Sequence, residues 1–472
     1  MNDGLQKIGD GAFQFCSSLE NITLPPTVIE IGGGAYFNGV GMGAFRGCRN
    51  LKEVKFNNGL QKIRASAFDG CSSLESIILP STVTEIGSWA FYSCNNLREI
   101  ILNDGLQKIG QMTFYNCNSL QSITLPSTLT EIGDYAFNGC SNLREVILND
   151  GLQRIGAGTF IDCSSLKCIK LPSTVVEIGN NAFKNCRSLK EVTLNDGLRK
   201  IEHWAFSRTS LESIILPSTV NEIGIGAFSS CRNLREVTLN NGLQKIGQWT
   251  FTNCTSLESI TLPPTLTEIG DSALDGCSNL KEVKLNEGLQ KIGAGAFSYC
   301  KSLRSVELPP TVVEIGTDAF RYCSNLREVE LNGVPQYLKF KALCNCDALE
   351  RFLFPTISYR LENLIQTNHW EELDDKLNEV RGVVQWEGNK LLVSSRLATY
   401  QNWDETKRDL GKIAQLVSYY ELKEATSTFE LALWKSKLDQ ADATNTTNRA
   451  AYRIDVPGPV KDTMLQYLDH TC

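Results

Sequence analysis

The residues of this 472-residue chain that could carry chemistry are its seventeen cysteines and three histidines. Thiolates and imidazole nitrogens bind zinc, and both groups act as nucleophiles or bases in enzymes. Fourteen of the cysteines, however, recur singly at a nearly constant interval: Cys16, Cys48, Cys71, Cys94, Cys117, Cys140, Cys163, Cys186, Cys231, Cys254, Cys277, Cys300, Cys323 and Cys346. A cysteine at one fixed buried position behaves as a small hydrophobic residue. We therefore predict a series of free, buried thiols.

The spacing of the cysteines also argues against crosslinks and metals. Cysteines on stacked repeats lie about 4.8 Å apart, whereas a disulfide requires Cβ atoms about 3.8 Å apart. Free thiols in such number favour a reducing compartment, and hence the cytoplasm. Cys344 and Cys346 form a Cys-x-Cys pair beside Asp347, but no second cysteine pair or histidine cluster accompanies them. We predict no metal site.

The remaining candidates indicate neither catalysis nor a cofactor. His203, His369 and His470 stand in no spacing typical of a metal site or a catalytic triad. The glycine-rich segment GGGAYFNGVGMG at 32–43 lacks the Gly-Lys-Ser or Gly-Lys-Thr ending of a phosphate-binding loop, and no long helix follows it. It echoes AFNGC at 136–140, so we interpret it as a partial duplication. We predict no catalytic residues, no cofactor and no enzymatic activity.

The element that must position these residues is a repeat of 23 residues, which residues 79–120 contain twice. Units of the type LPSTVTEIG alternate with units of the type LNDGLQKIG, so the full sequence period is 46 residues. There are two irregularities. Nine extra residues lie between Cys16 and Cys48, and one residue and its cysteine are missing at FSRTSL, residues 206–211. A period in this range is typical of a solenoid, and the irregularities predict loops.

Each unit predicts short strands joined by turns. Leu74, Ile77 and Leu79 place apolar residues two apart at the end of an LxxIxL segment, as a strand with one buried face requires. Pro80, or an Asn-Asp-Gly run in the alternate units, ends that strand, and a second extended piece leads to Ile86. Ordering one residue costs about 1–2 kcal/mol of backbone entropy, so an isolated unit is unstable. Units must therefore stack into a parallel sheet.

The signature LPxTVxEIGxxAFxxCxxLxxVxL recurs about fifteen times between residues 2 and 354 and resembles the BspA-type leucine-rich repeat. This resemblance implies a curved solenoid of about 15 rungs. Its parallel β-sheet would lie on the concave face, used in protein recognition and adhesion, with no catalytic residues. Two features depart from the family pattern. The array opens in the middle of a unit, and no export signal is visible although many members are surface proteins.

Charged residues alternate in sign at one position of the repeat. They are Lys7, Glu30, Lys62, Glu85, Lys108, Glu131, Arg154, Glu177, Lys200, Glu222, Lys245, Glu268, Lys291 and Glu314. Stacking should place each charge between two opposite ones, as a ladder of cross-strand pairs that ends at Tyr337. A slip by one rung would bring like charges together, so we expect the ladder to set the register.

The outward positions of the LxxIxL strands are the candidate partner-binding surface. One position carries an acidic stripe that includes Glu99, Glu145, Glu191 and Glu236, with serines on most of the rungs between. A second outward position carries Ile101, Ile147 and Ile215 among threonines. These seven residues form either a recognition surface or an ordinary solvated face, because strand propensity alone also selects Ile and Thr.

After residue 354 the repeat disappears, and we predict a helical domain at 355–472, as a cap or an interaction domain. Apolar residues recur there at spacings of three and four: Trp370, Leu373, Leu377 and Val380, and then Leu410, Ile413, Val417 and Tyr420. VVQWEGNKLLV at 383–393 fits either a hairpin or a helical link. Leu361, Leu364 and Ile365 are expected to cover the last rung of the solenoid.

Composition narrows the choice of partner. Neither part of the chain is basic and the net charge is −7, so we expect no nucleic-acid partner. No apolar run approaches the length of a membrane span. The prediction is a monomeric, cytoplasmic interaction scaffold that binds a protein. The alternative is an exported cell-surface adhesion or recognition protein whose N-terminal signal is missing from this chain.

Overall fold

The computed structural model describes residues 4–37, 40–332, 337–338, 342–353, 360, 384–387, 390–394, 412–413, 415–421 and 423. The chain divides into two units, which we describe separately. The first comprises Met1–Arg327 with Pro335–Ala348, and the second comprises Glu328–Val334 with Leu349–Cys472.

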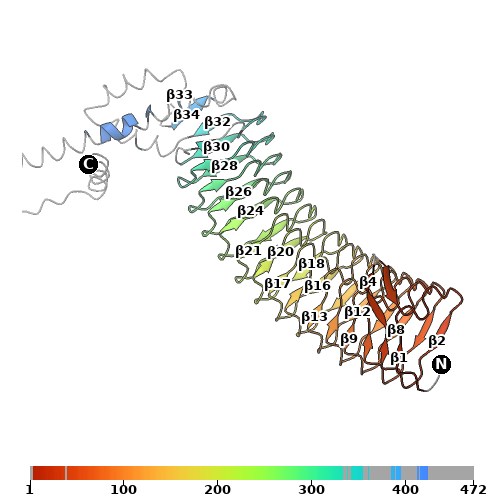
Figure 1. The fold of residues 1–472 in the computed structure, drawn as a ribbon. Coiled ribbons are helices and arrows are strands. Elements are labelled where there is room, and N and C mark those ends of the chain that lie inside the picture. Colours follow the sequence, from red (N-terminus) through yellow and green to blue (C-terminus); the bar gives the residue numbers. More distant parts are fainter. Residues whose placement is uncertain are drawn as a thin grey trace, which may run out of the picture. The chain divides into compact units, whose positions relative to one another are not determined.

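The first unit is a solenoid in which each rung contributes two strands (Figure 1). The strands of the LxxIxL segments, here called the A strands, are β2 (Asn21–Thr23), β6 (Glu53–Lys55), β8 (Ser76–Ile78), β10 (Glu99–Ile101), β12 (Ser122–Thr124), β14 (Glu145–Ile147), β16 (Cys168–Lys170), β18 (Glu191–Thr193), β20 (Ser213–Ile215), β22 (Glu236–Thr238), β24 (Ser259–Thr261), β26 (Glu282–Lys284) and β28 (Ser305–Leu308). They pair in parallel as β2 with β6, β8 with β10, β12 with β14 and β16 with β18, and β20 to β26 form one four-stranded sheet.

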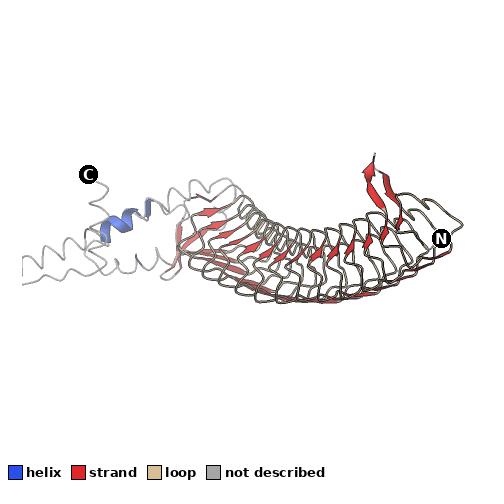
Figure 2. Ribbon diagram, turned by 60° about the horizontal axis from the view of Figure 1, so that its bottom comes forward, coloured by secondary structure: helices blue, strands red, loops and turns tan. Residues whose placement is uncertain are grey.

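The second series, here called the B strands, consists of two-residue strands that begin with the alternating charges. They are β1 (Lys7–Ile8), β3 (Glu30–Ile31), β7 (Lys62–Ile63), β9 (Glu85–Ile86), β11 (Lys108–Ile109), β13 (Glu131–Ile132), β15 (Arg154–Ile155), β17 (Glu177–Ile178), β19 (Lys200–Ile201), β21 (Glu222–Ile223), β23 (Lys245–Ile246), β25 (Glu268–Ile269), β27 (Lys291–Ile292), β29 (Glu314–Ile315) and β31 (Tyr337–Leu338). They form three parallel sheets, β1 to β13, β15 to β21 and β23 to β31. The predicted solenoid of parallel strands is thus confirmed, and its rungs follow a curved path (Figure 2).

The core between the two series is built from the repeat residues. Leu97, Phe91 and Cys94 of one rung are completely buried, and their equivalents are buried in the rungs between Phe45 and Leu326, whereas those of the first rung are half-buried or exposed. The phenylalanine rings of successive rungs stack with centroids 5.1 to 5.6 Å apart from Phe13 to Phe251. Leu274 interrupts this stack, because its rung has ALDGC in place of AFxxC. Because each rung buries its faces only against its neighbours, stacking supplies the stability that a single rung lacks.

The corners after the A strands explain why the sequence period is 46 rather than 23 residues. In each LNDG-type unit the asparagine side chain donates to corner carbonyls of the preceding LPST-type unit, as Asn103 does to Pro80 O and Val83 O at 2.7 and 3.1 Å. The same contact recurs at Asn57, Asn149, Asn195, Asn240 and Asn286. In return, the threonine of each LPST-type unit donates to a leucine carbonyl of the preceding LNDG-type unit, as Thr82 does to Leu60 O. Two complementary corner types therefore alternate.

The glycine-rich insertion forms an antiparallel hairpin of β4 (Gly33–Phe37) and β5 (Val40–Gly43), which projects from the stack in Figure 2. Gly33 and Gly43 occur at its base because a Cβ there would collide with the backbone oxygens of Ala65 and Ser66 on the next rung. The glycines thus permit close backbone approach.

The second unit contains a sheet that ends in a hairpin. β30 (Glu328–Leu331) pairs in parallel with β32 (Arg351–Leu353), and β32 pairs antiparallel with β34 (Lys390–Ser394). β34 also pairs antiparallel with β33 (Val384–Glu387), so the segment at 383–393 is a hairpin. Antiparallel pairing thereby covers the edge of β32 that a further rung would have occupied.

Residues 412–413, 415–421 and 423 of the same unit are helical. Ile413, Val417 and Tyr420 are buried, as their spacing predicts. Arg360 donates two hydrogen bonds to the carboxylate of Glu421, at 2.6 and 3.0 Å. The predicted residues Leu361, Leu364, Ile365, Trp370, Leu373, Leu377, Val380 and Leu410 lie outside the described residues. The division at 354 and 355 therefore stays a prediction.

Candidate recognition surface

The A strands expose the two side-chain positions that the sequence singled out. Their middle residue is turned into the core and the first and third point outward, so most show an exposed, buried, exposed pattern. The seven predicted site residues, Glu99, Glu145, Glu191, Glu236, Ile101, Ile147 and Ile215, are all exposed. Parallel pairing aligns them in two columns, with Glu99 beside Ser76, Glu145 beside Ser122 and Glu236 beside Ser213.

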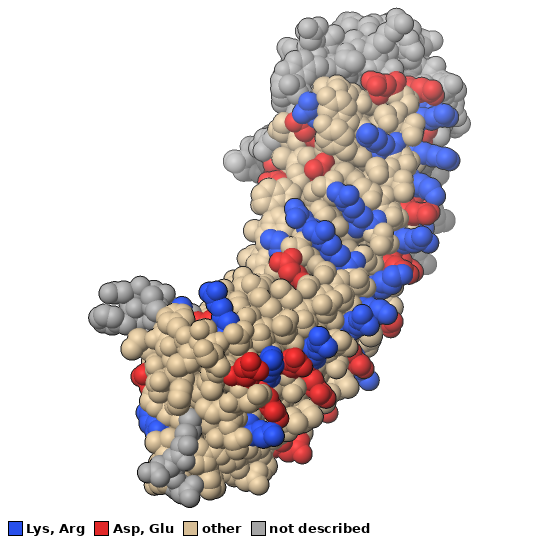
Figure 3. Space-filling model, turned by 90° about the vertical axis from the view of Figure 1, so that its right-hand side faces the viewer, with Lys and Arg blue, Asp and Glu red and all other residues tan. Residues whose placement is uncertain are grey.

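A third column, which the sequence analysis missed, runs beside the glutamates. An exposed basic residue immediately precedes the glutamate in each of these strands: Lys52, Arg98, Arg144, Lys190, Arg235 and Lys281. Some of them pair with acids of neighbouring rungs, Lys52 with Glu20 at 3.0 Å and Lys281 with Glu258 at 2.7 Å. The sign of the surface is therefore mixed, and Figure 3 shows acidic and basic side chains interspersed along one side of the molecule. Counting at the repeat spacing would have found this column.

The isoleucines give this surface an apolar part. Ile78 and Ile101 are register partners on adjacent strands, and their side chains are 62% and 46% exposed. Ile147 lies beside Thr124, and Ile215, which is 69% exposed, lies beside Thr238. Polar residues at the same position separate the Ile78–Ile101 pair, Ile147 and Ile215 from one another along the solenoid.

The B strands carry the predicted charge ladder in the predicted register. Lys7 is aligned with Glu30, Glu30 with Lys62, and Glu314 with Tyr337. Ion pairs join many neighbours, including Lys7 to Glu30 at 2.8 Å and Lys245 to Glu268 at 2.7 Å. The hydrogen bond from Lys7, with a second from Arg64, lowers the pKa of Glu30 below its usual value of 4.5. Because these side chains pair with one another, the ladder is a structural feature and not a candidate site.

The cysteines form the predicted column of buried thiols, with an additional role. Among the fourteen cysteines at the repeat position, Cys16 is exposed, Cys346 is half-buried and the other twelve are buried. Each buried Sγ donates a hydrogen bond to the carbonyl of the residue at the stacking phenylalanine position in the preceding rung, as Cys71 does to Phe45 O at 3.1 Å. Burial raises the pKa of the Cys231 thiol to about 11 and that of Cys277 to about 12. Such thiols are poor nucleophiles and oxidise slowly, so their free state does not identify a compartment.

Of the three histidines considered for catalysis or metal binding, one has a structural role and two lie outside the described residues. His203 Nδ1 accepts a hydrogen bond from the Ile225 amide of the next rung at 2.8 Å. His369 and His470 lie outside the described residues. In the part of the chain that the structure describes, no three His, Cys, Asp or Glu side chains gather as metal ligands. Nor does that part contain a helix long and apolar enough to cross a membrane.

Comparisons with known proteins agree with this architecture. The family model for the BspA type leucine-rich repeat region matches residues 1–39, 38–167, 153–281 and 244–366. A leucine-rich repeat protein from Bacteroides ovatus ATCC 8483 is similar in structure, with a TM-score of 0.59 and 31% identity over 73% of this chain and 81% of that chain.

Two further solved structures resemble the chain more distantly. A leucine-rich cell surface protein from Faecalibacterium prausnitzii A2-165 is 24% identical, with a TM-score of 0.40 over 71% of this chain and 87% of that chain. A leucine-rich repeat protein from Eubacterium ventriosum ATCC 27560 is 20% identical, with a TM-score of 0.42 over 58% of this chain and 82% of that chain. Comparison with curated proteins found no match. On the repeat, the fold and the family match together, this chain belongs to the BspA-type leucine-rich repeat family.

Proposed function

We propose that this chain is a non-enzymatic recognition scaffold that binds a protein partner through the outward face of its A strands. Proteins of its family are generally binding scaffolds, used in protein interaction or surface adhesion. The observation that carries the proposal is the column of exposed isoleucines at Ile78, Ile101, Ile147 and Ile215. Apolar groups beside charged columns match the apolar centre and polar rim of a protein interface.

The charged columns would orient the partner. Glu99, Glu145, Glu191 and Glu236 recur every second rung, each preceded by a lysine or arginine. A partner with a complementary spacing of charges gains specificity and association rate from these rows more than raw affinity. Because the rows contain both signs, they favour a protein over a polyanion such as a nucleic acid.

We place this scaffold at the cell surface, as an adhesion or recognition protein, rather than in the cytoplasm. The cytoplasmic prediction depended on the free thiols, and it is not supported because those thiols are buried and have raised pKa values. Membership of a family whose proteins are typically exported favours the surface. Antibody labelling of intact and permeabilised cells tests the location, since label that requires permeabilisation would return the protein to the cytoplasm.

The binding face is tested by replacing Ile101, Ile147 and Ile215 together with threonine, the residue that other rungs carry at the same position. A matched control replaces Ile29, Val176 and Val313 with threonine, because these are also exposed β-branched residues but lie outside the A strands. We expect partner capture by the immobilised chain, read by mass spectrometry, to fall at least about tenfold in the first variant only. Equal capture by both variants would contradict the proposed face.

A further inference from the structure

One turn of the solenoid is a residue shorter than the others. In regular rungs two residues separate the cysteine from the next buried leucine, whereas Thr209, which replaces the cysteine, is followed by Ser210 alone before Leu211. The Thr209 side chain keeps the place of the thiol, since its Oγ1 lies 3.2 Å from Cys231 Sγ. The Ser210 hydroxyl donates to Arg187 O, just as Ser72 does to Arg49 O in a regular pair of turns. The missing residue is therefore the second one after the cysteine position.

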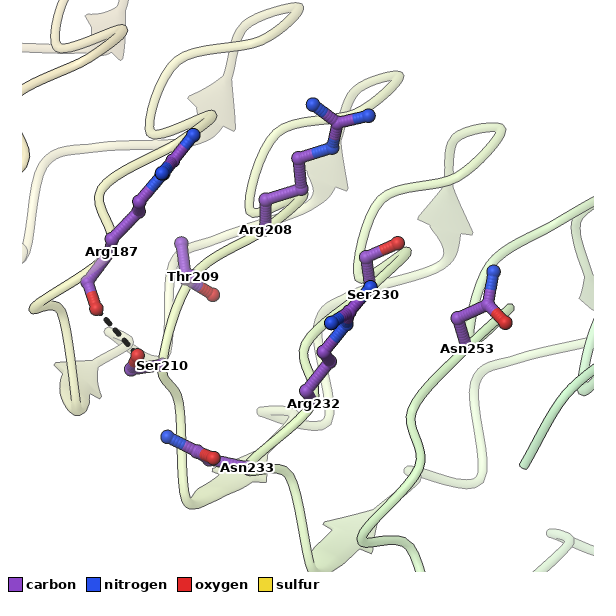
Figure 4. Close-up of a pocket in the computed structure, with 8 residues that line it drawn as sticks. All are labelled: Arg187, Arg208, Thr209, Ser210, Ser230, Arg232, Asn233 and Asn253. Atoms are coloured by element: carbon purple, nitrogen blue, oxygen red, sulfur yellow. Dashed lines mark hydrogen bonds between the residues drawn. The ribbon is translucent and has the colours of Figure 1, made fainter. Parts of the chain in front are cut away.

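A hollow of about 640 Å³ lies in the surface beside the shortened turn. It is bounded by Arg187 on the preceding turn, by Arg208 and Thr209 on the shortened turn, and by Arg232 and Asn233 on the following turn (Figure 4). All eight side chains that line it are polar or charged, and none is acidic. These side chains are rich in hydrogen-bond donors.

The three arginines bring positive charge that is not neutralised locally. Each is exposed, and within the described residues none has a carboxylate within ion-pair distance. Glu212, the nearest acid to Arg208 along the chain, is paired with Lys190 at 3.1 Å. A guanidinium remains charged at every physiological pH and offers a planar fork of donors to oxyanions.

We propose that this hollow binds a phosphate or sulfate monoester group. Such a group presents three terminal oxygens in a tetrahedral arrangement, which can accept from three guanidinium groups on three successive turns. A carboxylate has only two oxygens, which a single arginine fork can saturate. The hollow is larger than one such group, so the alcohol portion of the ester fits beside it, against Thr209, Ser210 and Asn233.

Calorimetric titration at constant ionic strength tests the site on the full chain, with a hexose phosphate, the matching hexose sulfate, the free hexose and acetate as probes. We expect the phosphate or the sulfate to bind, and the hexose and acetate to bind at least about tenfold more weakly. Tighter binding of one ester identifies which of the two the site takes. Binding of neither ester, or equal binding of acetate, would overturn the proposal.

Variants keep the test specific. Arg187→Gln and Arg232→Gln should each weaken ester binding about threefold to tenfold, whereas Arg49→Gln, at the same turn position beside a regular turn, should not. Arg208 has a φ of 59°, in the left-handed region, so Arg208→Asn is the tolerated change there. Insertion of one serine after Ser210 restores the regular turn, retains every arginine and should abolish binding without lowering the melting temperature. Equal weakening of ester binding by Arg49→Gln and Arg187→Gln would show that binding depends on general surface charge and would contradict the proposed site.

Discussion

The buried cysteines belong to a chemically reactive residue type, but their burial in the core makes these thiols unreactive. Cysteine is a reactive residue only as a thiolate, and burial disfavours the charged form. Burial raises the pKa of Cys231 to about 11, and it also raises the pKa of Cys94 and Cys140 in the same column. The thiol instead serves as a second donor to a core carbonyl: Phe68 O accepts from Cys94 Sγ of the next rung and from the Cys71 amide of its own rung.

Thiol titration near pH 8 checks this assignment. Among the sixteen cysteines that the structure describes, we expect rapid reaction in the native protein only at the exposed Cys16 and Cys168, with slower reaction at the half-buried Cys344 and Cys346. In denaturant without reductant, all seventeen cysteines should react. Rapid native reaction of ten or more thiols, or loss of titratable thiols in denaturant through disulfides, would contradict the buried column.

The charge ladder predicts how stability depends on pH. Hydrogen bonds from Lys7 and Arg64 lower the pKa of Glu30, and a hydrogen bond from Lys245 lowers that of Glu268. A depressed carboxylate pKa contributes stability above the unfolded value of 4.5, which is lost as pH falls through the folded pKa. We therefore expect the melting temperature to decline below about pH 4.5.

Replacing Glu30 and Glu268 with glutamine should flatten that decline at a cost of about 0.2–1 kcal/mol per ion pair near neutral pH. The control is Glu99→Gln, because Glu99 is exposed on the A strands and outside the ladder. A control variant that flattens the decline equally would show that the acid sensitivity arises elsewhere.

At the residue scale, the repeat position predicted burial well, because every copy of a position meets the same neighbours. It located the outward glutamates and isoleucines and the core cysteines. It did not locate the arginine hollow. Arg187 and Arg232 share one turn position, directly after a cysteine, whereas Arg208 directly precedes Thr209, so the three form no motif in the sequence. The sequence did show the lost residue at FSRTSL. Which side chains line the hollow beside that turn depends on the residues of the neighbouring turns, as the structure shows.

At the scale of the element, the alternation of corners carries stability that no single rung contains. The Asn240 amide donates to Pro217 O and Val220 O at 2.7 and 2.9 Å, and its oxygen accepts from the Gly242 amide at 2.6 Å. Asn240→Ala removes all three bonds and should lower the free energy of unfolding by about 1–3 kcal/mol, because partly buried backbone groups lose their partners.

Chemical denaturation measures that loss, and the adjacent Asn241→Ala is its control because the Asn241 side chain is exposed and only its carbonyl, which the change retains, accepts a bond from Thr265. We expect the control to change stability by less than about 0.5 kcal/mol. Similar losses in the two variants would show that the corner bonds contribute nothing measurable.

Deletions test the 46-residue period directly. Removing residues 125–170 keeps both alternations, because an LPST-type unit again follows an LNDG-type unit. Removing residues 125–147 instead brings Lys108 beside Arg154 and stacks two LNDG-type corners. The shorter deletion should therefore lower the melting temperature more, although it removes fewer residues. Equal melting temperatures for the two deletions would refute the role of the ladder and corners in register.

At the scale of the element the sequence predicted both strands of each rung, since period-two alternation and turn residues act locally. It left open whether 383–393 was a hairpin, because a short apolar run fits several structures in isolation. The choice is settled by pairing with β32, which lies about 40 residues earlier in the chain and is invisible to local pattern. The corner bonds were likewise missed, although the alternation that they explain was visible.

At the scale of the whole molecule, an array of open-ended rungs needs protected ends. A strand without a neighbour exposes backbone donors and acceptors that invite edge-to-edge association. Within the second unit, β34 pairs with β32 from Arg351 to Leu353, and β33 pairs with β34 in turn. We infer that the hairpin prevents β32 from recruiting another chain, in the place where the sequence analysis expected Leu361, Leu364 and Ile365 to act.

Two truncations separate the hairpin from the rest of the tail. A chain that ends at residue 354 loses β33 and β34 and leaves the edge of β32 open, whereas a chain that ends at residue 394 retains them. We expect the shorter chain to aggregate in size-exclusion chromatography with light scattering, and the longer one to elute mainly as a monomer, because strand pairing satisfies the edge. If both truncations aggregate, residues beyond 394 supply the protection instead. If both remain monomeric and melt at the temperature of the full chain, the edge of β32 needs no cover, and the tail is better sought as a separate binding module.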